Sequence, residues 1–491
     1  MPCPARLKLT EYFSNELGDF EDIELDFENI TMEHDTRKFL SPSIIKNSYS
    51  IFFYPIKERI ASIINKVVQH IRNERKDLAV EILQLNKELN DTHLGYSSCY
   101  AQGNGIGEDV ARFLVDAIEQ GGFLNEDFPN NLDNLKLFVP FLSHDRISDL
   151  VTNLSRDILI EYTQKQCELF NIPLVIDNRD VYYWESSVEI ENWMHANNFP
   201  RLIVRDRNFS QPNSLYKYLF VPSNLLIQKD RLFNYEFSNY IINKIQIEKE
   251  QEFYALTSIV VEARDLKTKQ KIYEKLKEND FDIRDKLKLK DLVRRNNAFR
   301  DRLNMFYNQY EFERINISRA KYNEYLITKE NKLNEINVFS DELKYRNYVL
   351  GFLAVIFNNM LYYPTLINDV NDFKNKPFEF HVNQRNEDLT AFFPNDKVMV
   401  YHKNTNRLTD INFTEIISTA RANNYEEVLL FLREARSSDI SLEIKSIFEN
   451  TGIMIYYFTD IDILSMLSNS RDFSNFDYRT LDSIRTTILN S

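Results

Sequence analysis

The sequence contains 491 residues, of which 43% are hydrophobic and 27% are charged, and its formal net charge is −14. A chain of this length exceeds one ordinary hydrophobic core, so we expect two or three domains. No apolar run reaches the ~18 residues that a membrane-spanning helix needs. The strongly negative charge is not typical of a protein that simply coats nucleic acid.

The cysteines and the first residues indicate a reduced, cytoplasmic setting. Cys3, Cys99 and Cys167 are too few for a disulfide framework and show no metal-ligand spacing. Residues 1–6 lack the apolar segment of a signal peptide. We therefore expect a cytoplasmic protein without a membrane anchor.

Charge is unevenly distributed along the chain. Ten acids and no Lys or Arg fall within residues 11–35, whereas residues 264–302 hold fourteen Lys or Arg and eight acids. The basic stretch predicts either a solvated helix or a contact with a nucleic-acid backbone. In the second case the acidic stretch is a cover that DNA displaces. The candidate nucleic-acid-binding residues are Lys286, Lys288, Lys290, Arg294 and Arg295.

Residues 1–235 predict an α+β domain. Apolar residues recur at helical spacing in 55–90, 108–120 and 145–169. Residues 236–335 contain no glycine or proline and predict a charged helical connector. Short strand-like segments with turn signals between them are found at 173–176, 201–204 and 218–221.

Six of the nine glycines lie between Gly95 and Gly122, which indicates a left-handed backbone or a close approach of the chain. Polar residues of the 145–169 helix fall on one stripe of its surface. The glycine spacing is not a phosphate-binding loop, since no Gly-Lys-Ser/Thr follows, nor a dinucleotide fingerprint. The alternative is a solvated helix face. The candidate ligand or regulatory residues are Gly103, Gly105, Gly107, Asp145, Asp149 and Asn153.

Residues 336–491 show the clearest order of elements. A helix at 340–361 precedes three strand candidates, and helices then alternate with strands to give the order α-β-β-β-α-β-α-β-α. The segments after the first helix are 378–382, 389–393, 398–402, 412–422, 428–432, 440–449 and 453–457, followed by two further helices.

This order, together with Asp388, Tyr401 and Lys403, resembles the restriction-endonuclease-like nuclease fold of the PD-(D/E)xK family, nearest its Mrr-type branch. The resemblance implies a metal-binding acid on the second strand, Asp388, and a catalytic lysine on the third, Lys403. Mg²⁺ or Mn²⁺ would polarise a phosphate there. Tyr401 stands where the family has Glu or Gln, and a neutral phenol is a poor ligand for Mg²⁺. Glu342 is a further carboxylate candidate.

Two functions follow from these observations. The first is a metal-dependent nuclease that acts on DNA, with an N-terminal sensing or assembly domain, in the bacterial anti-phage defence setting that the resemblance implies. The second is a non-catalytic interaction subunit of a larger defence or nucleic-acid assembly, with a degenerate nuclease domain. The expected partners are DNA and either another protein or a second copy of this chain, with no membrane contact.

Overall fold

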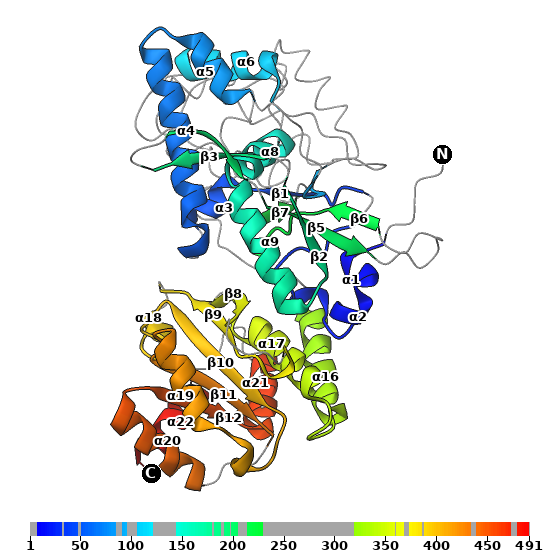
Figure 1. The fold of residues 1–491 in the computed structure, drawn as a ribbon, viewed down its shortest axis with the longest axis vertical. Helices are drawn as coiled ribbons and strands as arrows, with labels where there is room; N and C mark the ends of the chain where they lie inside the picture. Colours follow the sequence, from blue (N-terminus) through cyan, green and yellow to red (C-terminus); the bar gives the residue numbers. More distant parts are fainter. Residues whose placement is uncertain are drawn as a thin grey trace, which may run out of the picture.

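The chain is a multidomain α+β protein in which an N-terminal body up to residue 228 is followed by a C-terminal body from residue 319 (Figure 1). The basic stretch and most of the predicted connector lie outside the described residues. The computed structural model describes residues 7–31, 34–47, 51–84, 91–95, 106–120, 144–178, 181–187, 191–196, 198–204, 214–228, 319–358, 360–367, 373–384, 387–433, 438–472 and 479–490.

Amphipathic helices form much of the N-terminal body. In α4 (Tyr54–Arg72) the apolar residues from Ile56 to Ile71 are buried at helical spacing. Glu74 has a left-handed φ of 60° after the end of α4, so the predicted 55–90 helix is two helices. The remaining helical segments are α1 (Leu9–Tyr12), α2 (Ser14–Leu17), η1 (Asp22–Glu24), α3 (Pro42–Asn47), η2 (Ile51–Phe53), α5 (Lys76–Leu83) and α6 (Glu108–Gln120).

The predicted 145–169 helix is also divided. Ser155 lies between α8 (His144–Leu154) and α9 (Arg156–Phe170). Its hydroxyl donates to the carbonyl of Val151 at 2.6 Å, a side-chain bond of the kind that bends helices. Asn171 then ends α9 in the left-handed conformation.

Three small antiparallel sheets complete the N-terminal body, with strand orders β1-β7, β2-β5-β6 and β3-β4. Trp184 and Trp193 face each other across the β3-β4 pair. The predicted strand at 218–221 is wrong, because the strand ends at Lys217 and the next residues are buried without strand pairing. The elements are β1 (Lys38–Leu40), β2 (Leu174–Asp177), β3 (Val181–Ser186), β4 (Glu191–Ala196), β5 (Phe199–Val204), β6 (Ser214–Lys217), η4 (Ser223–Leu225) and β7 (Leu226–Gln228).

The C-terminal body is organised around a five-stranded mixed sheet of order β12-β11-β10-β9-β8. β9 is antiparallel to both its neighbours, whereas β10, β11 and β12 are parallel to one another. Every residue of β9, β11 and β12 is buried, as expected for strands covered on both faces. The strands are β8 (Leu361–Leu366), β9 (Phe378–Val382), β10 (Lys397–Lys403), β11 (Glu427–Leu432) and β12 (Met454–Phe458).

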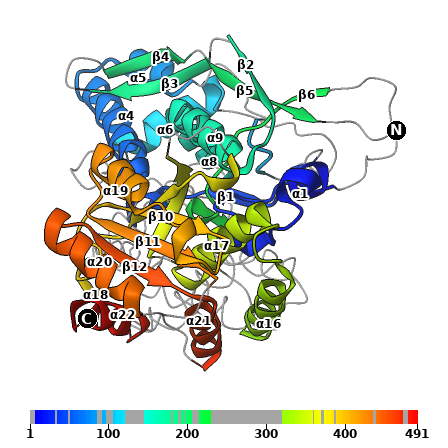
Figure 2. The same cartoon turned by 60° about the horizontal axis from the view of Figure 1, so that its bottom comes forward.

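Two groups of helices flank this sheet (Figure 2). One group comprises α16, α17 and α21, which contact one another, and the other includes α20 and α22, which pack together on β12. The helices are α16 (Arg319–Glu335), α17 (Glu342–Ile356), α18 (Glu387–Thr390), α19 (Phe413–Ala422), α20 (Ser438–Thr451), α21 (Asp460–Asp472) and α22 (Arg479–Asn490), with short turns η6 (Phe373–Asn375) and η7 (Leu408–Asp410).

Two predictions for the C-terminal body, one of a strand and one of a helix, are wrong. The predicted strand at 389–393 is instead the end of α18 and the turns after it, with Leu389 and Phe393 buried at the i, i+4 spacing of a helical turn. The predicted 340–361 helix stops at Ile356, and the first strand is β8, which contains Pro364. Proline is tolerated there because β8 is an edge strand with an irregular register.

Buried polar contacts join the two bodies. Glu24 of η1 and Lys329 of α16 form an ion pair in which both residues are 2% exposed, and the Tyr325 hydroxyl donates to the same carboxylate at 2.8 Å. Farther along the junction, the Gln166 amide donates to the carbonyl of Pro364 at 2.9 Å. These contacts fix the N-terminal body against α16, α17 and β8.

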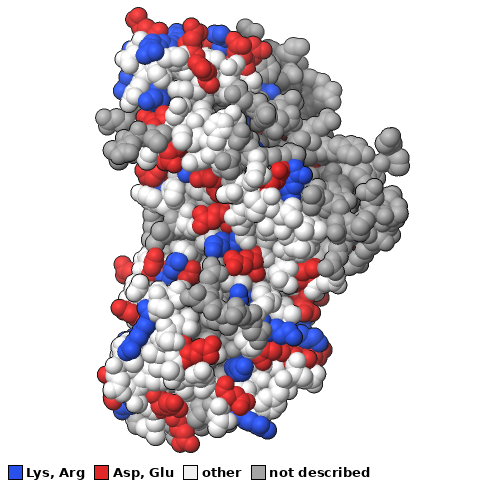
Figure 3. Space-filling model, viewed as in Figure 1, with Lys and Arg blue, Asp and Glu red and all other residues white. Residues whose placement is uncertain are grey.

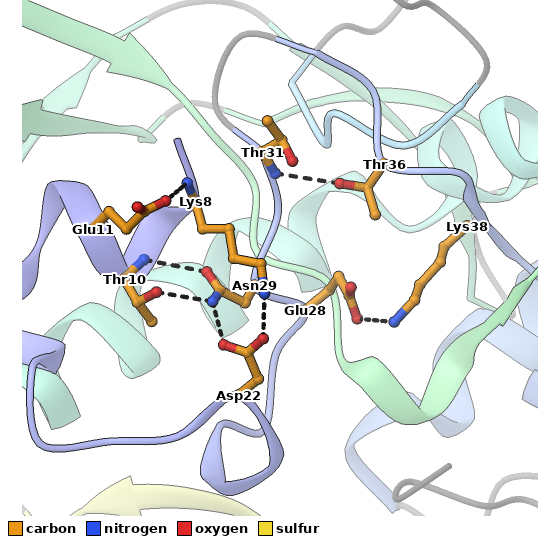
Figure 4. Close-up of polar contacts among 9 residues, drawn as sticks. All are labelled: Lys8, Thr10, Glu11, Asp22, Glu28, Asn29, Thr31, Thr36 and Lys38. Carbon is orange, nitrogen blue, oxygen red and sulfur yellow. Dashed lines mark hydrogen bonds and ion pairs between the residues drawn. The ribbon is translucent and has the colours of Figure 1, made fainter. Parts of the chain in front are cut away.

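Several acidic residues of 11–35 form polar contacts within the N-terminal body (Figure 4). Asp22 pairs with Lys8 and accepts a hydrogen bond from the Asn29 amide at 2.6 Å. Glu28 pairs with Lys38 at 2.5 Å. These contacts make the acidic stretch an integral part of the fold and do not support the hypothesis of a cover that DNA displaces.

Candidate functional site

Three of the four predicted catalytic residues gather at the carboxyl end of β10. Tyr401 and Lys403 alternate on this strand with His402, and Lys403 donates to the side-chain oxygen of Asn375 at 3.2 Å. Glu342, at the start of α17, accepts a hydrogen bond from the backbone N–H of Asn404 at 3.2 Å. The carboxyl end of β10 therefore has one carboxylate, one phenol and one ammonium group beside it.

The phenol of Tyr401 is neutral at this edge. Tyr401 is 7% exposed, and burial raises its pKa to about 12, with further contributions from the carboxylates of Glu415 and Glu342. A neutral phenol offers no negative charge to a divalent cation. Tyr401 is consequently a buried, uncharged aromatic group in this structure.

Asp388 lies at the other end of the sheet from Lys403. β9 and β10 are antiparallel and His381 pairs with Lys397, so β9 ends where β10 begins. Asp388 follows β9 on α18 and is exposed. β10 is seven residues long, which separates its two ends by roughly 20 Å. The predicted metal-binding set of Asp388 with Lys403 is not assembled, because the segment assigned as its strand is a helix.

The second strand carries a different acid, Glu379, which sequence reasoning missed. Its carboxylate accepts hydrogen bonds from Thr365 and Lys397, each at 2.9 Å, and from the Tyr425 hydroxyl. Burial alone would raise its pKa, but these donors from Tyr425, Lys397 and Thr365 lower the pKa below its ordinary value. These three hydrogen bonds pair the buried Glu379 carboxylate within the protein. An acid inside the apolar run of β9 was the signal for it.

Mg²⁺ or Mn²⁺ does not fit the residues predicted to hold it. Tyr401 is neutral, Asp388 is distant, and Glu342 alone supplies a carboxylate close to Lys403. In the part of the chain that the structure describes, no group of three or more His, Cys, Asp or Glu side chains is arranged to hold a metal ion. We derive no chemical step through a metal at this edge.

Two positively charged side chains, Arg346 and Lys403, lie near His402 at this end of β10. Arg346 of α17 is fully buried, and its guanidinium donates to Asn347 and to the carbonyl of Leu169. Burial lowers its pKa to about 10, and none of its contacts within the described residues is with a carboxylate. Burial, Arg346 and Lys403 together lower the pKa of His402 to about 3. Sequence reasoning did not single out either Arg346 or His402.

The glycine-rich candidate site is described in part. Gly103 and Gly105 lie outside the described residues, and Gly107 precedes α6 with open space where a side chain would be. Gly95 instead provides the close approach. Its φ is +145°, and a Cβ there would lie 2.8 Å from oxygens of both Asp35 and Asp145.

The polar stripe on α8 is not the solvated face that we considered as its alternative. Asn153 is 6% exposed and donates to the carbonyl of Asp149 at 2.9 Å. His93, two residues before Gly95, has a left-handed φ of 50°. Burial lowers its pKa to about 4 despite a hydrogen bond with the backbone of His34. Asp145 and Asp149 are themselves half-buried, at the margin of this packed junction.

The candidate nucleic-acid-binding residues Lys286, Lys288, Lys290, Arg294 and Arg295 lie outside the described residues. On the face drawn in Figure 3, acidic and basic side chains are interspersed over the coloured part of the surface.

One protein-family model matches the chain, and the match lies in the N-terminal body. The family model described as "Domain of unknown function (DUF8370)" matches residues 19–233, a segment that includes the Gly95–Asp145 junction and ends before the sheet of the C-terminal body begins. No curated protein and no solved structure matches the chain. Among the described residues, no helix combines the length and the apolar character needed to cross a bilayer.

Proposed function

We propose that the protein is a non-catalytic interaction subunit of a nucleic-acid-associated assembly, with a C-terminal domain that resembles a nuclease but has a degenerate site. The separation of Asp388 from Lys403 carries this proposal, because the two groups would have to share one phosphate to act together. The sheet order and strand directions support the resemblance in fold. A defence setting and contact with DNA are proposed from the resemblance alone.

The carboxyl edge of β10 favours a second candidate, a metal-dependent nuclease. Glu342 bonds the backbone one residue from Lys403, so a carboxylate and an ammonium group do share this edge. If this candidate is correct, Glu342 rather than Asp388 is the acid that matters.

A nuclease assay separates the two candidates. Full-length protein would be incubated with duplex DNA, single-stranded DNA and RNA in the presence of Mg²⁺ or Mn²⁺. We expect no cleavage by the wild type and no difference for Lys403→Ala. The control is Lys344→Ala, whose side chain is 60% exposed on α17. Cleavage that Lys403→Ala or Glu342→Gln abolishes, and Lys344→Ala retains, would establish the second candidate instead.

The interaction role has its own measurement. Light scattering on the purified chain would report a second copy as partner, and fluorescence anisotropy with labelled DNA would report nucleic-acid binding. A DNA contact through phosphates weakens steeply as salt increases. If the chain stays monomeric at all concentrations and binds neither DNA nor RNA at low salt, self-association and direct nucleic-acid binding are both contradicted.

A further inference from the structure

A pocket of about 670 Å³ lies between the two bodies. The N-terminal body contributes α2, the end of α9 and β2, and the C-terminal body contributes β8, η6 and the residue after it. Apolar side chains form much of its wall, among them Ile172, Leu174, Leu366 and Phe373. Its volume is typical of sites for small organic ligands, which are often found at domain junctions.

Lys376 is the positive charge that the C-terminal body contributes to the pocket wall. Lys376 is half-buried in the pocket wall and forms no ion pair among the described residues. Phe373 also lines it, and the buried Arg346 guanidinium lies 4.6 Å from the centroid of that ring. His402 contacts the Lys376 carbonyl at 3.3 Å, and Lys403 follows it in β10.

Arg346 is an unusual charge. Buried cations in proteins are normally paired with carboxylates, but the contacts of Arg346 within the described residues are an amide, a carbonyl and two aromatic rings. Its positive field is therefore not cancelled locally. An anionic group beside Lys376 would lie in that field, and burial from bulk water would strengthen the attraction.

The opposite wall accepts hydrogen bonds. Glu16 and Glu168 bring carboxylates, and Gln164 and Asn171 bring amides. Glu168 also pairs with Lys165 at 3.9 Å, and the Gln164 amide donates to the carbonyl of Asn198 at 2.8 Å, which leaves its side-chain oxygen as the acceptor. These groups surround the carboxyl end of α9, where the helix dipole is negative. A ligand group there would be a hydrogen-bond donor, such as a hydroxyl or amino group. The pocket thus favours anionic character on one side and donors on the other.

We propose that this pocket binds a nucleoside phosphate. The phosphate would lie at Lys376, the sugar hydroxyls and base amino groups would donate toward Glu16 and Glu168, and the flat base would pack on the apolar wall with Phe373. An amino acid has the same two kinds of end but would leave most of the volume empty. This inference does not depend on the proposed function, because none of the ligand contacts involves Tyr401 or Asp388.

Calorimetric titration of the full chain with the four common nucleoside monophosphates tests the proposal. Binding of at least one is expected. Lys376→Gln removes one charge-assisted hydrogen bond, so its affinity for that nucleotide should fall roughly tenfold or more. Lys374→Gln is the matched control: Lys374 is exposed, two residues away, and not part of the pocket wall. Its affinity should match the wild type.

Three results would each overturn the proposal. The first is that no nucleotide binds at about 1 mM. The second is that Lys376→Gln binds as tightly as Lys374→Gln while both variants retain the wild-type melting temperature. The third is that inorganic phosphate binds as tightly as the nucleotide, since the base and sugar would then contribute nothing. Weaker binding by both phosphate and the corresponding nucleoside than by the nucleotide would support it.

Discussion

Individual buried charges define how this molecule responds to pH, and Glu427 is the clearest example. It begins β11, is 6% exposed, and accepts a hydrogen bond from the Asn395 amide at 3.1 Å. Burial raises its pKa to about 7, against the lowering effect of the Asn395 hydrogen bond; the nearby Glu426 raises the pKa further and Arg485 lowers it. The folded protein therefore holds this carboxyl in its neutral form well above the pH at which the unfolded chain ionises.

The stability that Glu427 contributes should be lost as pH rises. A raised folded pKa means that the folded state binds more protons between about pH 4.5 and 7, so stability falls across that interval. Glu427→Gln removes the titration and should be more stable than the wild type at pH 8 by on the order of 2–3 kcal/mol. Urea unfolding at pH 5 and pH 8 measures this difference.

Glu426→Gln is the control for that measurement, since Glu426 is exposed and next in sequence. It should change the pH profile only slightly. A Glu427→Gln profile that superimposes on the wild type would show that this carboxyl does not titrate near neutrality. Buried histidines such as His402 act in the opposite sense, losing stability as pH falls, so only the difference between variant and wild type is diagnostic.

At the scale of elements, the sequence predicts correctly those helices and strands whose buried residues follow one regular pattern, either helical spacing or a continuous apolar run. The helical spacing from Ile60 to Ile71 predicted α4, and the apolar run Val428 to Leu432 predicted β11. The strand at 389–393 failed because a short apolar run with propensity for either structure became a helical turn. β8 was missed because Pro364 and the left-handed Tyr363 interrupt its pattern.

The candidate sites were harder to predict, because they depend on which ends of strands meet. Lys403 and Glu342 lie at the same end of β10, whereas Asp388 lies near its other end because the segment predicted as its strand is a helix. The proximity of Gly95 to Asp145 joins residues 50 positions apart in sequence, and the glycine clustering alone indicated only that some close approach was needed. Arg346 has no local pattern at all, because its contacts come from distant parts of the chain.

Helix α17 makes one such distant contact through a glycine. A Cβ at Gly351 would lie 2.5 Å from a carboxylate oxygen of Glu24 and 3.0 Å from the Lys329 ammonium. Gly351→Ala should destabilise the protein by about 1–3 kcal/mol, since the crowding of a buried pair outweighs the better helix propensity of alanine. Thermal unfolding measures the effect. Gly107→Ala, with no atom within 4 Å, should be close to neutral, and equal melting temperatures would contradict the close approach.

At the scale of the whole molecule, the junction makes the two bodies one structure. Glu24 and Lys329 are separated by 305 residues in sequence, yet they form a buried pair supported by Tyr325. Aromatic rings continue the same junction, with Phe52 stacked on Tyr363 at 4.1 Å. The C-terminal body is therefore fixed against the N-terminal body, and a ligand in the pocket between them would contact both.

Breaking the buried pair should separate the unfolding of the two bodies. Lys329→Met leaves the Glu24 carboxylate buried without its cation, which typically costs about 3–5 kcal/mol. We expect calorimetry to show one transition for the wild type and two for this variant. The double variant Lys329→Met with Glu24→Gln should recover much of the loss, because no unpaired charge remains.

Lys332→Met provides the matched control for the junction. Lys332 lies one turn farther along α16 and pairs with Glu21 at 3.2 Å, with both side chains more than a third exposed. An exposed pair contributes about 0–1 kcal/mol, so this variant should keep a single transition close to the wild-type melting temperature. If Lys329→Met and Lys332→Met unfold alike, the buried pair does not couple the bodies. A split transition confined to Lys329→Met places that coupling at Glu24.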